Sequence, residues 1–197
     1  MNPEDIGHKY DRLAGWWQAR HRDSDYGVAQ LLRALAFCRD GGSALDVGCG
    51  AGGRLVGLLQ QRGFGVTGID VSAEMVRLAR LEHPQHDFVQ HDIGTWESER
   101  RFDLVFAWDS IFHLPLAMQQ PVVSKLCGLL APQGVLMYTF GDAHGEHTDV
   151  WRGDTFHYSS IGIDGNLRLL LDSGLKVVHL EMDQFPQNHV CVIATRL

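Results

Sequence analysis

The chain has 197 residues, 45% hydrophobic and 21% charged, which is enough for one well-buried domain and too short for two ordinary ones. No apolar run reaches the roughly 18 residues of a membrane-spanning helix, and the first residues lack the apolar core of a secretory signal. Seventeen Lys and Arg against 24 Asp and Glu give a net charge of −7, which disfavours nucleic-acid binding through a global basic field.

The apolar pattern predicts helices and short buried strands in alternation. Residues 4–40 are expected to form two helices before a first strand at 44–47. The elements that follow are a helix at 54–61, a strand at 65–70, a helix at 72–81, strands at 87–90 and 102–108, a helix at 115–130 and a strand at 134–140. Strands separated by helices indicate an α/β fold with a doubly wound parallel sheet.

The last part of the chain has a different pattern. Residues 141–164 are polar and poorly periodic, and we expect a loop or a lid over a site. Two β-rich runs, 175–183 and 189–195, are joined by so short a turn that they must pair antiparallel. The sequence therefore predicts one domain over 1–197, with a helical cap at 1–42, a core at 43–140 and a possible lid with a C-terminal hairpin at 141–197.

The strongest motif is the glycine-rich stretch at 45–53, which follows the first strand and opens a helix. Its glycines permit a tight turn and let a ligand approach the backbone closely. Asp70 ends the second strand, 22 residues after Gly48, where its carboxylate can accept both hydroxyls of a ribose. Asp92 lies another 22 residues on, where it can accept an exocyclic amine of adenine while Ile93 covers the ring. All three sites are at carboxyl ends of strands, where open parallel sheets bind ligands.

These motifs resemble the successive cofactor motifs of class I S-adenosylmethionine-dependent methyltransferases. The resemblance extends over about residues 43–140, and the final antiparallel pair fits the family's Rossmann-like, mostly parallel, seven-stranded sheet. Segment 107–115 is further similar to small bacterial methyltransferases of unassigned substrate. The resemblance implies S-adenosylmethionine as cofactor and S-adenosylhomocysteine as product. One departure is Gln133, where the family usually has Gly; it concerns a turn and not the pocket.

The resemblance also implies roles for individual residues. Gly48 and Gly50 would lie against the methionine moiety, Asp70 at the ribose, and Asp92 with Ile93 at the adenine. Asp46 would orient the loop and the cofactor's amino group. The predicted cofactor contacts further include Cys49, Val71, Met75 and Trp108. We interpret Cys49 as a small residue whose backbone matters, and not as a reactive thiol.

The first helix is expected to cover the cofactor, as it does in related small methyltransferases. Tyr10 and Arg20 would then meet the methionine end, with Arg20 pairing with its carboxylate. Trp17 is a candidate for the substrate pocket, whereas Trp16 is expected to bury the helix against the core. The alternative for all of these side chains is core packing alone.

The nearest alternative function is that of a nicotinamide-dependent oxidoreductase. Gly48, Gly50 and Gly53 satisfy the G-x-G-x-x-G pattern, and Asp70 lies about where a ribose-binding acid should. Asp46, Asp92 and the C-terminal hairpin favour the methyltransferase, because a dehydrogenase would need a separate catalytic domain. A second alternative is a protein that binds the cofactor without turnover.

His113, after the fourth strand, is the candidate general base, and its alternative role is packing at the start of the next helix. Asp109 and Ser110 could bond the substrate or the cofactor's amino group, or cap a helix. By resemblance to the same small methyltransferases, His157 and Tyr158 are candidates for the acceptor pocket, with packing on the sheet as the alternative.

No metal is predicted, because no carboxylate or cysteine completes a set with the loop histidines at 144, 147 and 157. The four cysteines are scattered without a C-x-x-C spacing, which indicates a reduced, cytoplasmic protein. Residues 141–197 hold four Lys or Arg against eight acids, so a polyanionic acceptor would be repelled there. We expect a small-molecule acceptor and no membrane partner; the sequence leaves the oligomeric state open.

Overall fold

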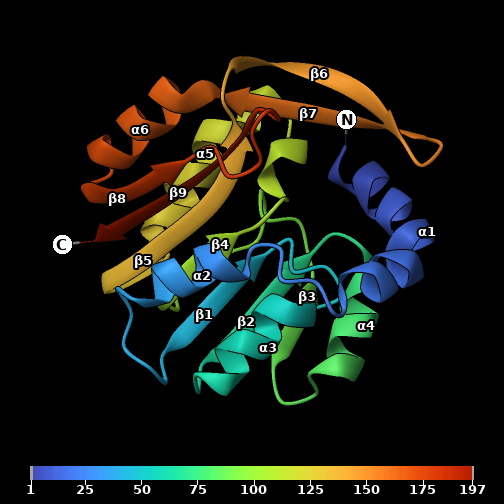
Figure 1. The fold of residues 1–197 in the computed structure, drawn as a ribbon, viewed down its shortest axis with the longest axis horizontal. Helices are drawn as coiled ribbons and strands as arrows, with labels where there is room; N and C mark the ends of the chain where they lie inside the picture. Colours follow the sequence, from blue (N-terminus) through green and yellow to red (C-terminus); the bar gives the residue numbers. More distant parts are fainter. Residues whose placement is uncertain (1, 197) are drawn as a thin grey trace.

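Seven strands form one twisted sheet in the computed structural model, which describes residues 2–196 (Figure 1). Their spatial order is β3-β2-β1-β4-β5-β9-β8, with the first five parallel and β9 antiparallel to both of its neighbours. The strands are β1 Ser43–Val47, β2 Gly65–Asp70, β3 Asp87–Gln90, β4 Phe102–Ala107, β5 Leu130–Gly141, β8 Leu175–Glu181 and β9 His189–Arg196. The predicted doubly wound sheet with its terminal antiparallel pair is confirmed.

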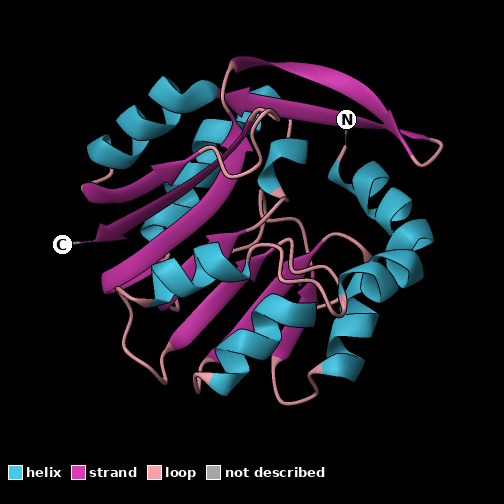
Figure 2. Cartoon of the chain, in the orientation of Figure 1, coloured by secondary structure: helices cyan, strands magenta, loops and turns pink. Residues whose placement is uncertain are grey.

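Helices cover both faces of this sheet (Figure 2). One face carries α2 Val28–Leu35, α3 Gly53–Gln61 and α4 Ala73–Glu82, and the other carries α5 Leu116–Gly128 and α6 Gly162–Asp172. Successive side chains of β4 point to opposite faces of the sheet, as they do in any strand. Leu104 and Phe106 lie in the core under α2–α4, whereas Val105 and Ala107 lie in the core under α5 and α6. None of the helices described is long and apolar enough to cross a bilayer.

The first helix, α1 Pro3–His21, packs against α4. Asp11 holds the two helices together, since one of its oxygens accepts the Ser72 hydroxyl at 2.6 Å and the Glu74 amide at 2.9 Å. Ser72 is also the N-cap of α4 and accepts the Met75 amide. Gly7 permits this close approach, because a Cβ there would lie 2.6 Å from the Val71 carbonyl oxygen. The cap helix is thereby placed beside the end of β2.

The stretch expected to be an irregular loop contains a β-hairpin. β6 His144–Trp151 and β7 Asp154–Ile161 pair antiparallel and form a second, two-stranded sheet. In Figure 1 this hairpin arches over the carboxyl ends of the main sheet, and its tip reaches α1. Most of β6 is exposed, so it lacks the alternation of apolar and polar residues by which a strand is recognised. Strand β5 also begins earlier than predicted, because Leu130 pairs with Phe102 of β4.

The departure from the family pattern at Gln133 lies at an exposed irregularity of β5, between the residues that pair with Phe102 and Leu104 of β4, and its φ is +64°. A left-handed backbone conformation costs a non-glycine residue roughly 1–2 kcal/mol. Glycine avoids this strain, but its unfolded chain has more conformational entropy to lose on folding, which cancels part of the gain. We therefore expect Gln133→Gly to raise the free energy of unfolding by about 0.5–1 kcal/mol in urea titrations. Gln133→Ala serves as the control, because it shortens the side chain and keeps the strain. Equal stability of the two variants would contradict this explanation.

Candidate functional site

The turn after β1 is shaped by close backbone contacts that only glycine permits. Gly48 has a φ of +75°, and a Cβ there would lie 2.1 Å from the Cβ of Ser110. The amides of Gly48 and Cys49 both donate to the Ile69 carbonyl, at 2.7 and 3.1 Å. From the far side, the Ser110 hydroxyl donates to the Val47 carbonyl at 2.6 Å. The turn is thus held between the ends of β2 and β4.

Asp70, at the end of β2, holds the next part of this turn. One carboxylate oxygen accepts the Gly50 amide and the other accepts the Ser72 amide, each at 2.8 Å. Because a carboxylate oxygen has more than one acceptor direction, both can still accept hydroxyls of a ligand. Burial raises the pKa of Asp70 to about 6, although its hydrogen bonds to backbone amides act in the opposite direction.

These strand ends line a cleft, which we call the strand-end cleft. Asp92 accepts the Gly94 amide at 2.8 Å and lies beside the buried side chain of Ile93. Met75 is buried under the turn. The predicted cofactor residues that line this cleft are Tyr10, Gly48, Gly50, Asp70, Val71, Met75, Asp92, Ile93 and Trp108. The sequence prediction thus placed residues from six separate segments in one cleft.

A second opening, the glycine-loop cavity, continues this cleft along the turn. It contains Asp46 and Cys49, which are both buried, and it shares Gly48 and Gly50 with the strand-end cleft. Burial raises the pKa of Asp46, and the Asp70 carboxylate raises it further. Two arginines line this cavity: Arg22, at the end of α1, and Arg54, in the first turn of α3.

Arg20 is a predicted site residue that the structure does not bring to the site. Its side chain is exposed, and it lines none of the openings described. Arg54 lies by the glycine turn instead, donating to the Tyr26 carbonyl with its guanidinium 5.4 Å from the Tyr26 ring. The signal that could have indicated Arg54 is its position directly after the glycines, where a helix begins.

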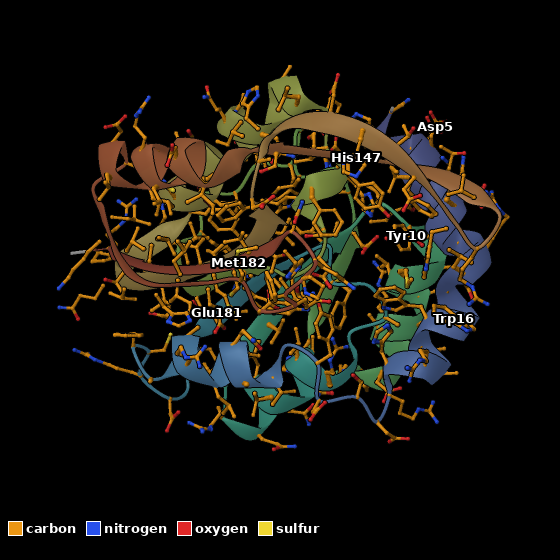
Figure 3. The ribbon with its side chains drawn as sticks, turned by 45° about the horizontal axis from the view of Figure 1, so that its top comes forward. Asp5, Tyr10, Trp16, His147, Glu181 and Met182 are labelled. Atoms are coloured by element: carbon orange, nitrogen blue, oxygen red, sulfur yellow. The ribbon has the colours of Figure 1, made fainter. Side chains whose placement is uncertain are left out.

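A third opening, the hairpin cleft, lies under β6 and β7 and has a volume of about 830 Å³. Figure 3 shows Tyr10 on the side of α1 that faces the middle of the molecule, below the hairpin that carries His147. Tyr158 lines this cleft, and the His147 ring stacks on it with centroids 5.3 Å apart. The His157 side chain, in contrast, lies outside the cleft lining and pairs with Glu146 at 3.3 Å.

Four residues line both the strand-end cleft and the hairpin cleft: Tyr10, Trp17, Asp109 and His113. The Tyr10 hydroxyl lies 2.9 Å from His113 Nε2, and His113 Nδ1 lies 2.8 Å from the His157 carbonyl oxygen. A carbonyl can only accept, so Nδ1 carries a proton. Burial lowers the pKa of His113 to about 4, so at neutral pH Nε2 has no proton and accepts the Tyr10 hydroxyl. His113 is therefore a neutral side chain with both ring nitrogens engaged.

Asp109 is held at this junction in a strained backbone conformation, with a φ of +52°. Its carboxylate accepts the Tyr26 hydroxyl at 2.7 Å and His189 Nε2 at 2.7 Å, and its amide donates to the Thr139 hydroxyl at 2.9 Å. His189 Nδ1 bonds to Asp183, so both of its nitrogens face carboxylates and the ring is cationic. Tyr26 and His189 were not predicted, because nothing local in the sequence connects them with Asp109.

Trp16 does not pack in the core as expected. It is 36% exposed, lies 5.5 Å from the Trp151 ring and carries the Arg152 guanidinium 3.8 Å above its own ring. Trp16 therefore joins α1 to the hairpin tip. Among residues 2–196, no three His, Cys, Asp or Glu side chains come together as a metal site.

A family model described as "Methyltransferase domain" matches residues 18–189. The chain belongs to this methyltransferase domain family. A curated relative, trans-aconitate 2-methyltransferase from Escherichia coli O139:H28, is 40% identical over 107 residues, which are 53% of this chain and 41% of the relative. The methyltransferase domain thus spans less than half the length of the curated relatives it matches.

Solved structures show the same fold. Magnesium protoporphyrin IX methyltransferase from Synechocystis, with bound S-adenosylmethionine, aligns with a TM-score of 0.73 at 20% identity, over 100% of this chain and 98% of that one. An amino pentose methyltransferase from Micromonospora echinaspora aligns with a TM-score of 0.69 at 18% identity, over 91% and 94% of the two chains. The predicted class I methyltransferase fold is therefore confirmed.

The neutral state of His113 has a measurable consequence for the methyltransferase domain. Burial lowers its pKa from 6.5 to about 4, although the His157 carbonyl acts in the opposite direction. The folded state then binds fewer protons than the unfolded state between these values, so stability is lost as the pH falls through this window. The 2.5 units between 6.5 and 4 correspond to about 3 kcal/mol of unfolding free energy.

We expect His113→Gln to remove most of this pH dependence in urea titrations between about pH 7 and pH 4.5. His8→Gln, on the exposed face of α1, is the matched control and should keep the wild-type slope. A His113→Gln variant whose stability falls as steeply as that of the wild type would show that His113 titrates normally.

Proposed function

We propose that this methyltransferase domain transfers a methyl group from S-adenosylmethionine to a small molecule bound in the hairpin cleft. The observation that carries the proposal is the junction of two openings at Tyr10, Trp17, Asp109 and His113. One opening has carboxylates at successive strand ends, as an adenosine requires, and the other is large enough for a small ligand.

The residues of the strand-end cleft fit the cofactor for two reasons. Their carboxylates can accept further hydrogen bonds, and the glycine turn leaves space for a ligand. Both Asp70 oxygens can accept ribose hydroxyls, Asp92 can accept the adenine amine, and Ile93 and Met75 offer apolar contacts. A Cβ at Gly50 would come no closer than 3.7 Å to another side chain, so that part of the turn is open to a ligand. Arg54, and not Arg20, is the proposed partner of the methionine carboxylate.

The bound cofactor supplies an electrophilic methyl group, so the protein needs no nucleophile of its own. What the chain contributes is position and the exclusion of water, by placing the acceptor in line at the junction. We propose that His113 acts as a positioning residue, because its Nε2 is occupied by the Tyr10 hydroxyl. Tyr10 and Trp17 would then line the junction at which donor and acceptor meet.

Two further features support a small-molecule acceptor and a cytoplasmic setting. The hairpin cleft is lined by Asp142, Glu146 and Asp149, and such a surface repels a polyanion such as RNA. The four cysteines form no disulfide, which supports a reducing, cytoplasmic setting.

The test is calorimetric titration of the ligand-stripped protein with S-adenosylhomocysteine, with NADH in parallel. We expect saturable one-to-one binding of S-adenosylhomocysteine and none of NADH. Binding of NADH alone would replace the proposal with an oxidoreductase. Binding of S-adenosylhomocysteine without methyl transfer to any of a broad panel of metabolites would favour a protein that holds the cofactor without turnover.

A further inference from the structure

The hairpin cleft is lined by aromatic rings on several sides. Seven aromatic residues contribute to it: Tyr10, Trp17, Tyr26, Phe112, Phe140, Trp151 and Tyr158. They come from α1, from the segments after α1 and β4, from β5 and from the hairpin, so aromatic residues lie on several sides of the space. The faces of such rings attract cations as well as apolar groups, and sets of them bind organic ammonium ions.

Acids predominate among the charged residues of the cleft lining. Its lining carries the carboxylates of Asp109, Asp142, Glu146 and Asp149. Over residues 2–196, no Lys or Arg side chain lines it. His189 is a cation, but its charge is balanced by the carboxylates of Asp109 and Asp183 on either side. In the same described part of the chain, neither Asp142 nor Asp149 forms an ion pair, so both leave negative charge at the cleft.

The Lys and Arg side chains that contact the hairpin have partners outside the cleft lining. Arg12 pairs with Asp154 at 2.8 Å, and Arg152 lies over the Trp16 ring. Lys9 donates to the Thr155 carbonyl and lies 5.4 Å from the Phe156 ring. A carboxylate ligand in the cleft would lose water and meet carboxylates, with no Arg or Lys of the lining to replace its hydration.

We propose that the acceptor is an amine, cationic at neutral pH and carried on an aromatic or apolar body. This inference rests on the proposed function and names the acceptor class for its site. The ammonium is attracted by Asp142 and Asp149 at the rim of the cleft, and its apolar body lies between the rings. A polycarboxylate such as trans-aconitate, the acceptor in the name of the curated relative, does not suit this lining.

The chemistry of the step balances without another reactant. The ammonium first loses one proton to solvent at the open rim of the cleft, which leaves a neutral amine with a free lone pair. That lone pair forms the new bond to the methyl carbon while the carbon–sulfur bond breaks, and the electrons of the broken bond stay on sulfur. The positive charge passes from the sulfonium to the methylated ammonium, and the product leaves as a cation.

The test compares three probes of matched shape: 2-phenylethylamine, 2-phenylethanol and 3-phenylpropanoate. Each is titrated calorimetrically into the protein at low salt, with and without S-adenosylhomocysteine. We expect the amine to bind about tenfold or more tightly than the carboxylate, with the alcohol between them. The cleft is present without a ligand, so this order should hold whether or not S-adenosylhomocysteine binds. A failure of the cofactor proposal is thereby separated from a failure of this one.

Charge-removing variants test whether the preference for the amine arises in the hairpin cleft. Asp142→Asn with Asp149→Asn should weaken amine binding by about tenfold at low salt and leave 2-phenylethanol unchanged, since only the charge differs. Asp164→Asn, on the exposed side of α6, removes the same charge outside the cleft and should leave all three probes unchanged. The inference is overturned if the carboxylate binds as tightly as the amine, if the amine does not bind, or if Asp164→Asn weakens the amine as much as the double variant does.

Discussion

Gly48→Ala is expected to give the largest loss of stability of any change in the glycine turn. The added methyl group would lie 2.1 Å from the Ser110 Cβ and 2.8 Å from its hydroxyl oxygen, in a residue whose φ is +75°. Overpacking costs roughly 1–3 kcal/mol and left-handed strain another 1–2 kcal/mol, so we expect a loss of about 3 kcal/mol in urea unfolding. The turn must also shift, and we expect the affinity for S-adenosylhomocysteine to fall by more than about tenfold.

Gly53→Ala is the matched control for this prediction. Gly53 also has a positive φ, of +50°, yet a Cβ there would meet nothing within 4 Å. The two variants therefore share the backbone strain and differ in the steric clash. We expect Gly53→Ala to cost only about 1 kcal/mol of stability and to leave the affinity nearly unchanged. If both variants behaved alike, strain alone would account for the glycine at position 48.

Asp70→Asn is expected to weaken S-adenosylhomocysteine binding at neutral pH by about 1–3 kcal/mol. The asparagine keeps the shape of the side chain, but its NH₂ group can accept neither a ribose hydroxyl nor a backbone amide. One of the two amides, of Gly50 or Ser72, would then lose its acceptor. Calorimetric titration of the variant and the wild type measures the difference directly.

The pH dependence of binding provides a second, independent signature of Asp70. Its pKa is raised to about 6, so the unliganded wild type takes up a proton as the pH falls through this value. The protonated acid has lost acceptor capacity, so affinity should decrease as the pH falls, by up to about tenfold per unit below 6. Asp70→Asn should show no such inflection, whereas Asp87→Asn, on the exposed start of β3, should keep it. An inflection near pH 6 that persists in Asp70→Asn would assign the titration to another group.

The residues of the strand-end cleft could be predicted because the information that places them is local. A buried strand followed by glycines and a helix defines a turn, and the spacing of Asp70 and Asp92 places each at the end of the next strand. Parallel strands bring their carboxyl ends to one edge, so these residues meet without any knowledge of side-chain packing. The prediction of the antiparallel C-terminal pair also rested on local information, because two strands joined by a short turn can only pair antiparallel.

The sequence by itself determined the sheet, the glycine turn and the acids around it, whereas the tertiary structure decided which residues line the hairpin cleft. Arg20 is ten residues from Tyr10, about 80° around the helix, and only packing against α4 shows which of the two faces the cleft. Asp109 meets His189 only because β9 pairs with β5, 80 residues along the chain. The hairpin was missed because β6 is largely solvent-exposed, and the register of the hairpin is set by backbone hydrogen bonds, which leave no periodic apolar signal.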